Sequence, residues 1–221
     1  MSERLRVAPR LLSVRALPRV DRALAAGLGC PERFTSIGVV TCDQDDALYA
    51  ALDHATKLAN VDVVYARSFY AGSAHASGPF SGEAIGVIAG TDPDEVREGL
   101  RALRRSLEEE ISFHRWSGDG QPMFFAHVIA ETGRYLSSMA SVEAGTPMAY
   151  LIAPPMESVI ALDAALKVAP VRLARYFGPP TETNFGGGYL VGNVADVQAA
   201  ARAFEDAVRD VAVRPLADSV R

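Results

Sequence analysis

Two carboxylates stand where predicted strands of the first half of the chain meet their loops. Asp45 follows a buried strand expected over 36–41, and Glu83 precedes another strand expected over 84–89. Both would lie at the margin of a sheet, where two acids can converge on a small cation. The alternative is a helix cap and an exposed turn carboxylate, and the spacing leaves both interpretations open.

Other reactive residue types lack the spacing that catalysis or metal binding needs. The four histidines form no HExxH motif and no i, i+4 pair, so we expect no dedicated zinc site, although the loop around His75 could capture a metal adventitiously. There is no Ser-His-Asp order and no GxSxG elbow. Cys30 and Cys42 are expected to be buried or half-buried thiols of a reducing compartment. We therefore expect no cofactor and no resident metal.

The run Asn-Phe-Gly-Gly-Gly at 184–188 resembles a phosphate-binding loop in composition. A phosphate loop must open a helix, whereas this run opens a predicted strand. We therefore predict a flexible loop with no nucleotide role.

The elements that would position these residues occur as two similar copies along the chain. Residues 52–61 match residues 162–171 at a constant offset of 110, with six of ten positions identical. A strand, a Pro/Gly-rich loop, a second strand and a long amphipathic helix follow in each copy. The repeat is much longer than a solenoid unit. It predicts two copies of one small domain, at 1–117 and 118–221, that meet in the segment 117–121.

Strands alternate with helices long enough to cover a sheet, which predicts the α/β fold class. Each half is expected to be an α+β sandwich, a sheet of ferredoxin-like size with helices packed on one face. The expected strands are 11–17, 36–41, 61–65, 84–89, 123–131, 148–153, 171–176 and 188–192, with a further one over 133–137. The expected helices are 20–28, 47–59, 92–111, 156–169 and 196–211, and the acids at 43–46 are expected to cap the second of them.

Composition narrows the classes of partner. Hydrophobic residues make up 49% and charged residues 22% of the 221 residues, which is typical of a globular protein. The net charge of −5, without a basic stripe, predicts no nucleic-acid partner. No apolar run approaches the ~20 residues that span a bilayer, so we expect no membrane segment. The arginine-rich N-terminal segment is predicted to form a folded strand and not a targeting peptide.

Two long loops, 68–81 and 177–187, occupy equivalent places in the two copies. Loops of this length inside compact domains are usually functional or disordered. Both carry aromatic residues among small ones, which is typical of a movable lid or gate.

The segment Lys-Leu-Ala-Asn-Val-Asp-Val at 57–63 resembles the signature of bacterial microcompartment (BMC) shell domains. Over nearly its full length the chain resembles the tandem-domain, circularly permuted shell proteins of ethanolamine-utilisation compartments. The densest blocks of resemblance lie at 45–46, 55–57, 63–65, 67–68, 70–72, 126–128, 135–138, 147–151, 153–155 and 182–184.

The resemblance implies a non-enzymatic shell protein inside the cytoplasm, in the shell of a bacterial microcompartment. Three chains would form a homotrimer, a flat pseudo-hexameric tile that assembles with other shell proteins. Lys57, and less directly Lys167, would contact neighbouring tiles at the edge. The alternative for both is a solvated lysine at the end of a helix.

The resemblance also implies a central pore and a ligand pocket. Two loops, matching 67–76 and 179–187, would gate the pore, and the gate residues would be Ser68, Phe69, Tyr70, His75, Glu182, Asn184 and Phe185. Each subunit would bind ethanolamine, biasing the gate closed, and the pocket residues would be Asp45, Glu83, Phe113 and Thr183. The glycines at 186–188 depart from the family pattern and are expected to loosen the second gate loop.

The competing hypothesis is a soluble sensor of small amines, or an enzyme that uses Asp45 and Glu83 as acid and base. The absence of a nucleophile–base arrangement and of a cofactor loop weighs against the enzyme.

Overall fold

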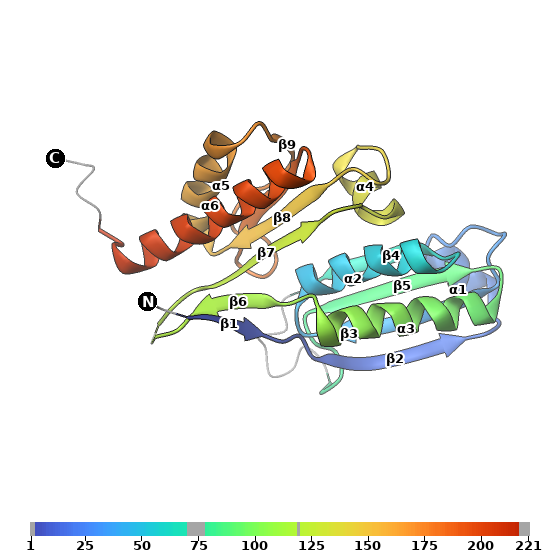
Figure 1. The fold of residues 1–221 in the computed structure, drawn as a ribbon. Helices are drawn as coiled ribbons and strands as arrows, with labels where there is room; N and C mark the ends of the chain where they lie inside the picture. The colour runs from blue at the N-terminus through green and yellow to red at the C-terminus, as the bar shows by residue number, and fades with distance from the viewer. Residues whose placement is uncertain (1–2, 70–77, 119, 217–221) are drawn as a thin grey trace. The chain divides into compact units, whose positions relative to one another are not determined.

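The computed structural model describes residues 3–69, 78–118 and 120–216. Its elements fall into two compact units, each described by itself. One draws its residues from Met1–Val7, Ser112–Thr132 and Met139–Arg221, and the other from Ala8–Ile111 and Gly133–Ser138. We call them the six-stranded unit and the four-stranded unit after their sheets (Figure 1).

The four-stranded unit is an antiparallel sheet of order β2-β3-β5-β4, with α2 and α3 on one face (Figure 1). Its elements in chain order are β2 (Leu11–Leu17), α1 (Arg22–Gly27), β3 (Ser36–Cys42), α2 (Asp45–Leu58), β4 (Asp62–Ser68), β5 (Ala84–Gly90) and α3 (Pro93–Glu109). The helix α3 begins as predicted, since the Asp92 side chain accepts a hydrogen bond from the backbone N–H of Asp94 at 2.8 Å.

The six-stranded unit has the strand order β1-β6-β7-β8-β10-β9, with α5 and α6 together on one face (Figure 1). Its elements are β1 (Arg4–Val7), β6 (Phe113–Trp116), β7 (Met123–Ile129), β8 (Met148–Ala153), α5 (Pro155–Val168), β9 (Arg172–Phe177), β10 (Gly186–Val191) and α6 (Val194–Val213). Every residue of β8 and β10 is buried. The continuous apolar run over 148–153 therefore reflects a strand covered on both faces.

The duplication read from the sequence is confirmed in the order of the elements. The series β2-α1-β3-α2-β4-β5-α3 recurs as β7-α4-β8-α5-β9-β10-α6, where α4 spans Arg134–Ala140. The sheet orders β2-β3-β5-β4 and β7-β8-β10-β9 match as well. The fold class, tandem α/β domains with helices on one sheet face, is thus as predicted. The boundary at residues 117 and 118 stays a prediction, and 117–121 lie between β6 and β7.

Several local predictions are wrong. The segment 133–137, expected to be a strand, leads into the helix α4, which begins at Arg134, and the four-residue strands β1 and β6 were not predicted. The acids at 43–46 do not cap α2 as a group. Gln44 is the N-cap and makes no side-chain cap bond, while the Asp43 carboxylate binds the backbone N–H of Arg10 at 2.6 Å and its guanidinium at 2.8 Å.

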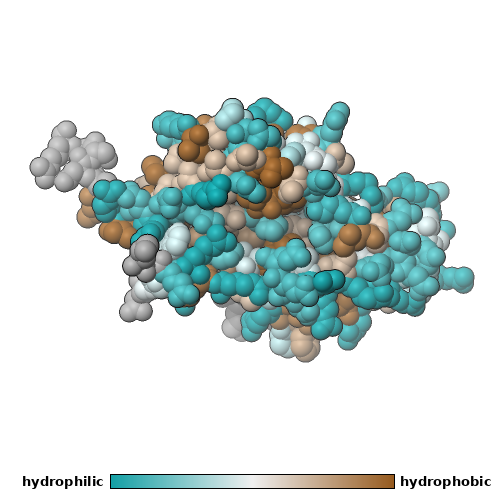
Figure 2. Space-filling view, viewed as in Figure 1, coloured by the Kyte–Doolittle hydropathy of each residue, from teal (hydrophilic) through white to brown (hydrophobic). Residues whose placement is uncertain are grey.

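The surface mixes hydrophilic residues with separate apolar ones, as the face in Figure 2 shows. Leu24, Met156, Val159 and Ile160 are among the large hydrophobic side chains that remain exposed. Within residues 3–69, 78–118 and 120–216, no helix is long and apolar enough to cross a membrane. Cys30 and Cys42 are free and buried, as predicted.

Candidate functional site

The first half of the predicted pocket lies where α2 begins. Asp45 is buried, with 7% of its surface exposed. One carboxylate oxygen accepts a hydrogen bond from the Ser68 hydroxyl at 2.6 Å, and the other accepts one from the backbone N–H of Asp46 at 2.9 Å. Ser68 is the last residue of β4. The acid is therefore hydrogen-bonded to the first of the predicted gate residues.

Glu83 lies beside the same sheet margin, directly before β5. Its backbone N–H donates to the carbonyl of Cys42 at 2.8 Å, and its own carbonyl accepts from the N–H of Phe69 at 2.9 Å. Partial burial raises the pKa of Glu83, and the charges of Asp45 and Asp43 raise it further. The structure thus brings Asp45 and Glu83 together as two acids whose charges interact.

A glycine that was not predicted to have a role sets this geometry. Gly82 has φ +64°, and a Cβ there would lie 2.2 Å from the Cys42 carbonyl oxygen. Only glycine allows the chain to turn this tightly against β3. A glycine immediately before a candidate acid was the signal available in the sequence.

The second half of the predicted pocket belongs to the six-stranded unit. Phe113 is buried in β6, and its ring centroid lies 5.2 Å from that of Phe125 and 5.7 Å from that of Phe185. Thr183 lies in a short turn in which the N–H of Thr181 donates to the carbonyl of Phe185 at 2.8 Å. A predicted gate residue, Phe185, therefore packs directly on a predicted pocket residue.

The predicted gate residues differ in how they are placed. Ser68 ends β4 and Phe69 follows it, whereas Tyr70 and His75 lie outside the described residues. Glu182 and Asn184 are exposed, and Phe185 is half-buried.

The expectation that the glycines at 186–188 loosen the second loop is wrong. They are buried residues of β10, paired with Leu151, Ile152 and Ala153 of β8. A Cβ on Gly187 would lie 1.9 Å from the carbonyl oxygen of Leu151. The glycines are there because two backbones approach closely, and they hold the end of the loop in place.

The two predicted edge lysines lie in the last turns of α2 and α5. Both are exposed, and the Lys167 ammonium forms an ion pair with Asp163 at 2.5 Å. Their contact with neighbouring tiles stays a prediction. Over the described part of the chain, no group of three His, Cys, Asp or Glu side chains could hold a metal ion.

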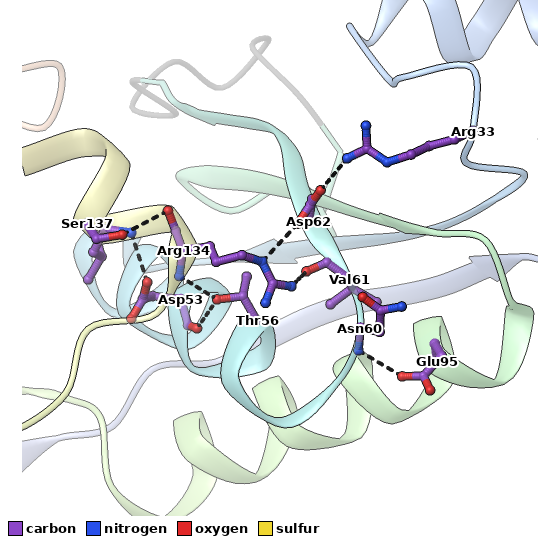
Figure 3. Close-up of polar contacts among 10 residues, drawn as sticks. Arg33, Asp53, Thr56, Asn60, Val61, Asp62, Glu95, Arg134 and Ser137 are labelled. Atoms are coloured by element: carbon purple, nitrogen blue, oxygen red, sulfur yellow. Dashed lines mark hydrogen bonds and ion pairs between the residues drawn. The ribbon is translucent and has the colours of Figure 1, made fainter. Parts of the chain in front are cut away.

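A buried polar network between α2 and the start of α4 was not foreseen (Figure 3). The Asp53 carboxylate, 1% exposed, accepts hydrogen bonds from the backbone N–H groups of Gly133 at 2.7 Å and Leu136 at 2.8 Å. Thr56 accepts from the N–H of Arg134 at 3.0 Å. Asp53 and Thr56 of α2 thus satisfy the free N–H groups at the start of α4.

The Arg134 side chain links the start of α4 to β4 and to the residue before it. Its guanidinium donates to Asp62 at 3.1 Å and to the Val61 carbonyl at 2.5 Å, and Asp62 also pairs with Arg33 at 2.9 Å. Because the contacts of Arg134 with Asp62 and Val61 join residues more than 70 positions apart, no local pattern signals them.

Comparison with known proteins agrees with this architecture. A family model described as "BMC domain" matches residues 36–116. The shell protein EutL of Clostridium perfringens is 45% identical over 95% of this chain and 97% of its own length, and EutL of Salmonella typhimurium is 44% identical over 95% and 96%. The crystal structure of the ethanolamine utilization protein EutL from Leptotrichia buccalis superposes with a TM-score of 0.92, at 48% identity over 96% of this chain and 98% of that one.

A more distant structure, the trimeric microcompartment shell protein PduB, shares the fold with a TM-score of 0.75 at 17% identity, over 93% of this chain and 90% of that one. The matched domain and the relatives at 44–45% identity define the class: this is a BMC-domain protein of the bacterial microcompartment shell. Within that class, the chain belongs to the EutL family of shell proteins. The relatives are shell components, which makes the family's role a structural one.

Proposed function

We propose that three copies of this chain close into a pseudo-hexameric tile of the shell, with a central pore and no catalytic activity. The support lies in the duplication. Each chain carries two domains with the same element order and the same sheet order, so three chains supply six similar domains. A ring of three is a closed symmetry in which near-identical interfaces repeat. The tile would assemble with other shell proteins.

We propose further that each subunit binds ethanolamine. The observation that carries this proposal is the pair Asp45 and Glu83, two acids close enough that one raises the pKa of the other. An ammonium group placed between the two carboxylates would offset their repulsion and would donate a charge-assisted hydrogen bond to each of them. The Phe113 backbone and the Thr183 hydroxyl would supply partners for the ligand hydroxyl.

Ligand binding would bias the pore gate toward the closed state. Ser68 donates to Asp45, and Phe69 donates to the Glu83 carbonyl, so the start of the first loop is bonded to both acids. Phe185, in the second loop, packs on Phe113. A ligand that favours one arrangement of these contacts shifts the loop populations by its difference in affinity.

The solution mass of the purified protein tests the tile. We expect a trimer of about three times the 23.6 kDa chain by light scattering. A monomer or dimer at all concentrations would remove the three-fold axis, and with it the pore.

Calorimetric titration tests the pocket. We expect ethanolamine to bind, and Glu83→Gln or Asp45→Asn to weaken binding by about tenfold or more through loss of a charged acceptor. Binding should also weaken as the pH falls through the raised pKa of Glu83, because the protonated acid carries no charge. Glu143→Gln, which changes an exposed acid elsewhere, should bind like the original protein.

Ethanol, which keeps the hydroxyl and lacks the ammonium, should not bind. Equal affinities in the two acid variants and in Glu143→Gln would contradict the pocket and leave the tile untouched.

A further inference from the structure

The repeated helices α2 and α5 are buried to very different extents. Both have 14 residues and align at the offset of 110. Asp46 and Ala50 of α2 are 7% and 3% exposed, whereas their counterparts Met156 and Ile160 of α5 are 64% and 47% exposed. We call the face of α2 that carries Asp46 and Ala50 its outer face. This face is covered in α2, whereas the same face of α5 is exposed and more apolar.

The start of α4 covers the outer face of α2. Its backbone N–H groups donate to Asp53, as described above, and the ring centroids of Tyr49 and Tyr135 lie 6.3 Å apart. Leu136, the third residue of α4, has no exposed surface. A short helix with a buried leucine is therefore what this face accommodates.

The counterpart of α4 in the other copy is α1. Each follows its strand after four residues, and at an offset of 112 Arg22 aligns with Arg134 and Leu24 with Leu136. Unlike Leu136, Leu24 is 50% exposed. The helix α1 uses Ala25 for packing, within a cluster that includes Ile37, Val87 and Ala89 of the sheet. Leu24 is left pointing outward.

We propose that α1 of one chain covers α5 of a second copy, with Leu24 packed among Met156, Val159 and Ile160. The contact would repeat between chains what α4 and α2 make within one chain. The inference rests on the proposed trimer, whose subunit interface it assigns. Each chain would give its α1 to one neighbour and receive α1 from the other, a head-to-tail contact that can close into a ring.

The polar residues around the two faces support this partner. Asp21 caps α1 itself, accepting from the N–H of Ala23 at 2.9 Å, so α1 needs no acid from the helix that it covers. Accordingly Asp163, the counterpart of Asp53, is exposed and pairs with Lys167. Asp21 and Arg22 on one side thus meet Lys167 and Asp163 on the other, a complementary set of charges.

Charge substitutions at the two faces test the assignment. A charge buried without a partner is costly, so Leu24→Asp and Ile160→Lys should each weaken assembly roughly a hundredfold, giving monomers by light scattering. The double variant should recover trimers, because each interface then pairs an aspartate with a lysine. Leu216→Asp, at a residue that is 93% exposed, is the matched control and should stay trimeric.

A cysteine pair gives a second readout that does not depend on weakened assembly. Ala23 and Val159 are the counterparts of Tyr135 and Tyr49, so Ala23→Cys combined with Val159→Cys should form disulfide-linked trimers on mild oxidation. Each single variant should stay unlinked. Circular dichroism should show native folding throughout, because the substituted side chains are exposed in the single chain.

The outcomes separate the two proposals. If the original protein is a trimer while both charge variants stay trimeric and the cysteine pair does not link, the α1–α5 interface is wrong and the tile stands. If the original protein is a monomer at all concentrations, the tile itself is wrong and the interface falls with it.

Discussion

Replacing Asp53 with alanine is expected to destabilise the fold by about 3 kcal/mol. The substitution leaves the N–H groups of Gly133 and Leu136 buried without their acceptor. Burial raises the pKa of Asp53, and the hydrogen bonds from Leu136 and Gly133 lower it. Removing the carboxylate therefore also relieves some desolvation. The loss of two bonds to a carboxylate outweighs that relief, because Thr56, the other side chain that caps α4, accepts from the N–H of Arg134 and leaves those of Gly133 and Leu136 to Asp53.

Chemical denaturation at a fixed protein concentration would measure this loss, since assembly makes apparent stability depend on concentration. Asp163→Ala is the matched control, because it removes the aligned acid from α5, where it is exposed and paired with Lys167. It should cost about 0.5 kcal/mol or less. Asp53→Asn, which keeps one acceptor oxygen, should fall between the two. Equal losses for Asp53→Ala and Asp163→Ala would show that the network in Figure 3 does not hold α4.

Gly187→Ala is expected to cost about 3 kcal/mol or more, or to prevent folding. Its Cβ would meet the Leu151 carbonyl oxygen at 1.9 Å and the Ile152 Cα at 2.9 Å. Both atoms are backbone of the paired strand β8, so no side-chain rotation can relieve the overlap. The ladder between β8 and β10 must separate or shift.

Thermal unfolding and soluble yield would record the effect of Gly187→Ala. Gly178→Ala is its control within the connection between β9 and β10, because a Cβ at Gly178 meets only the Tyr176 ring, at 3.5 Å. That variant should unfold within a few degrees of the original protein. A Gly187→Ala protein as stable as Gly178→Ala would mean that β10 is not pressed against β8 as described.

Gly187 and its two neighbours change how the second predicted gate loop is understood. From composition alone, three consecutive glycines indicate conformational freedom and predict a loosened loop. In the structure they permit close approach of two buried strands, so the loop ends on a fixed support. Composition could not separate these cases, because a glycine run has the same signature whether it bends freely or lies under another backbone.

Much of the fold was predictable because its signals are local. The pattern of α3 and its Asp92 cap, the apolar run of β8, and the repeat at offset 110 all place elements within a few residues of their observed bounds. The resemblance to BMC shell proteins, read from blocks spread along the chain, is confirmed by the relatives. The short strands β1 and β6 escaped notice because each is stabilised by pairing with the other across more than 100 residues.

The candidate site was predictable only as a list of residues. The position of Asp45 after β3 and of Glu83 before β5 suggested that both acids lie at a sheet margin, and their interaction agrees with that. The hydrogen bond from Ser68 and the tight turn at Gly82 depend on how β3, β4 and β5 meet, and spacing along the chain does not contain that.

Asp53 and Asp163 mark the limit of what sequence alone can tell. They occupy the same position of the same repeat, and both sequences predict the same helix with the same periodicity. One is buried and caps another helix, while the other is exposed and pairs with a lysine. Helical periodicity depends on residues three and four positions apart, and the sequence contains that spacing directly. The sequence therefore suffices to define the duplicated α/β fold and its family. Burial depends on which distant segment covers a helix face, and only the tertiary structure decides that.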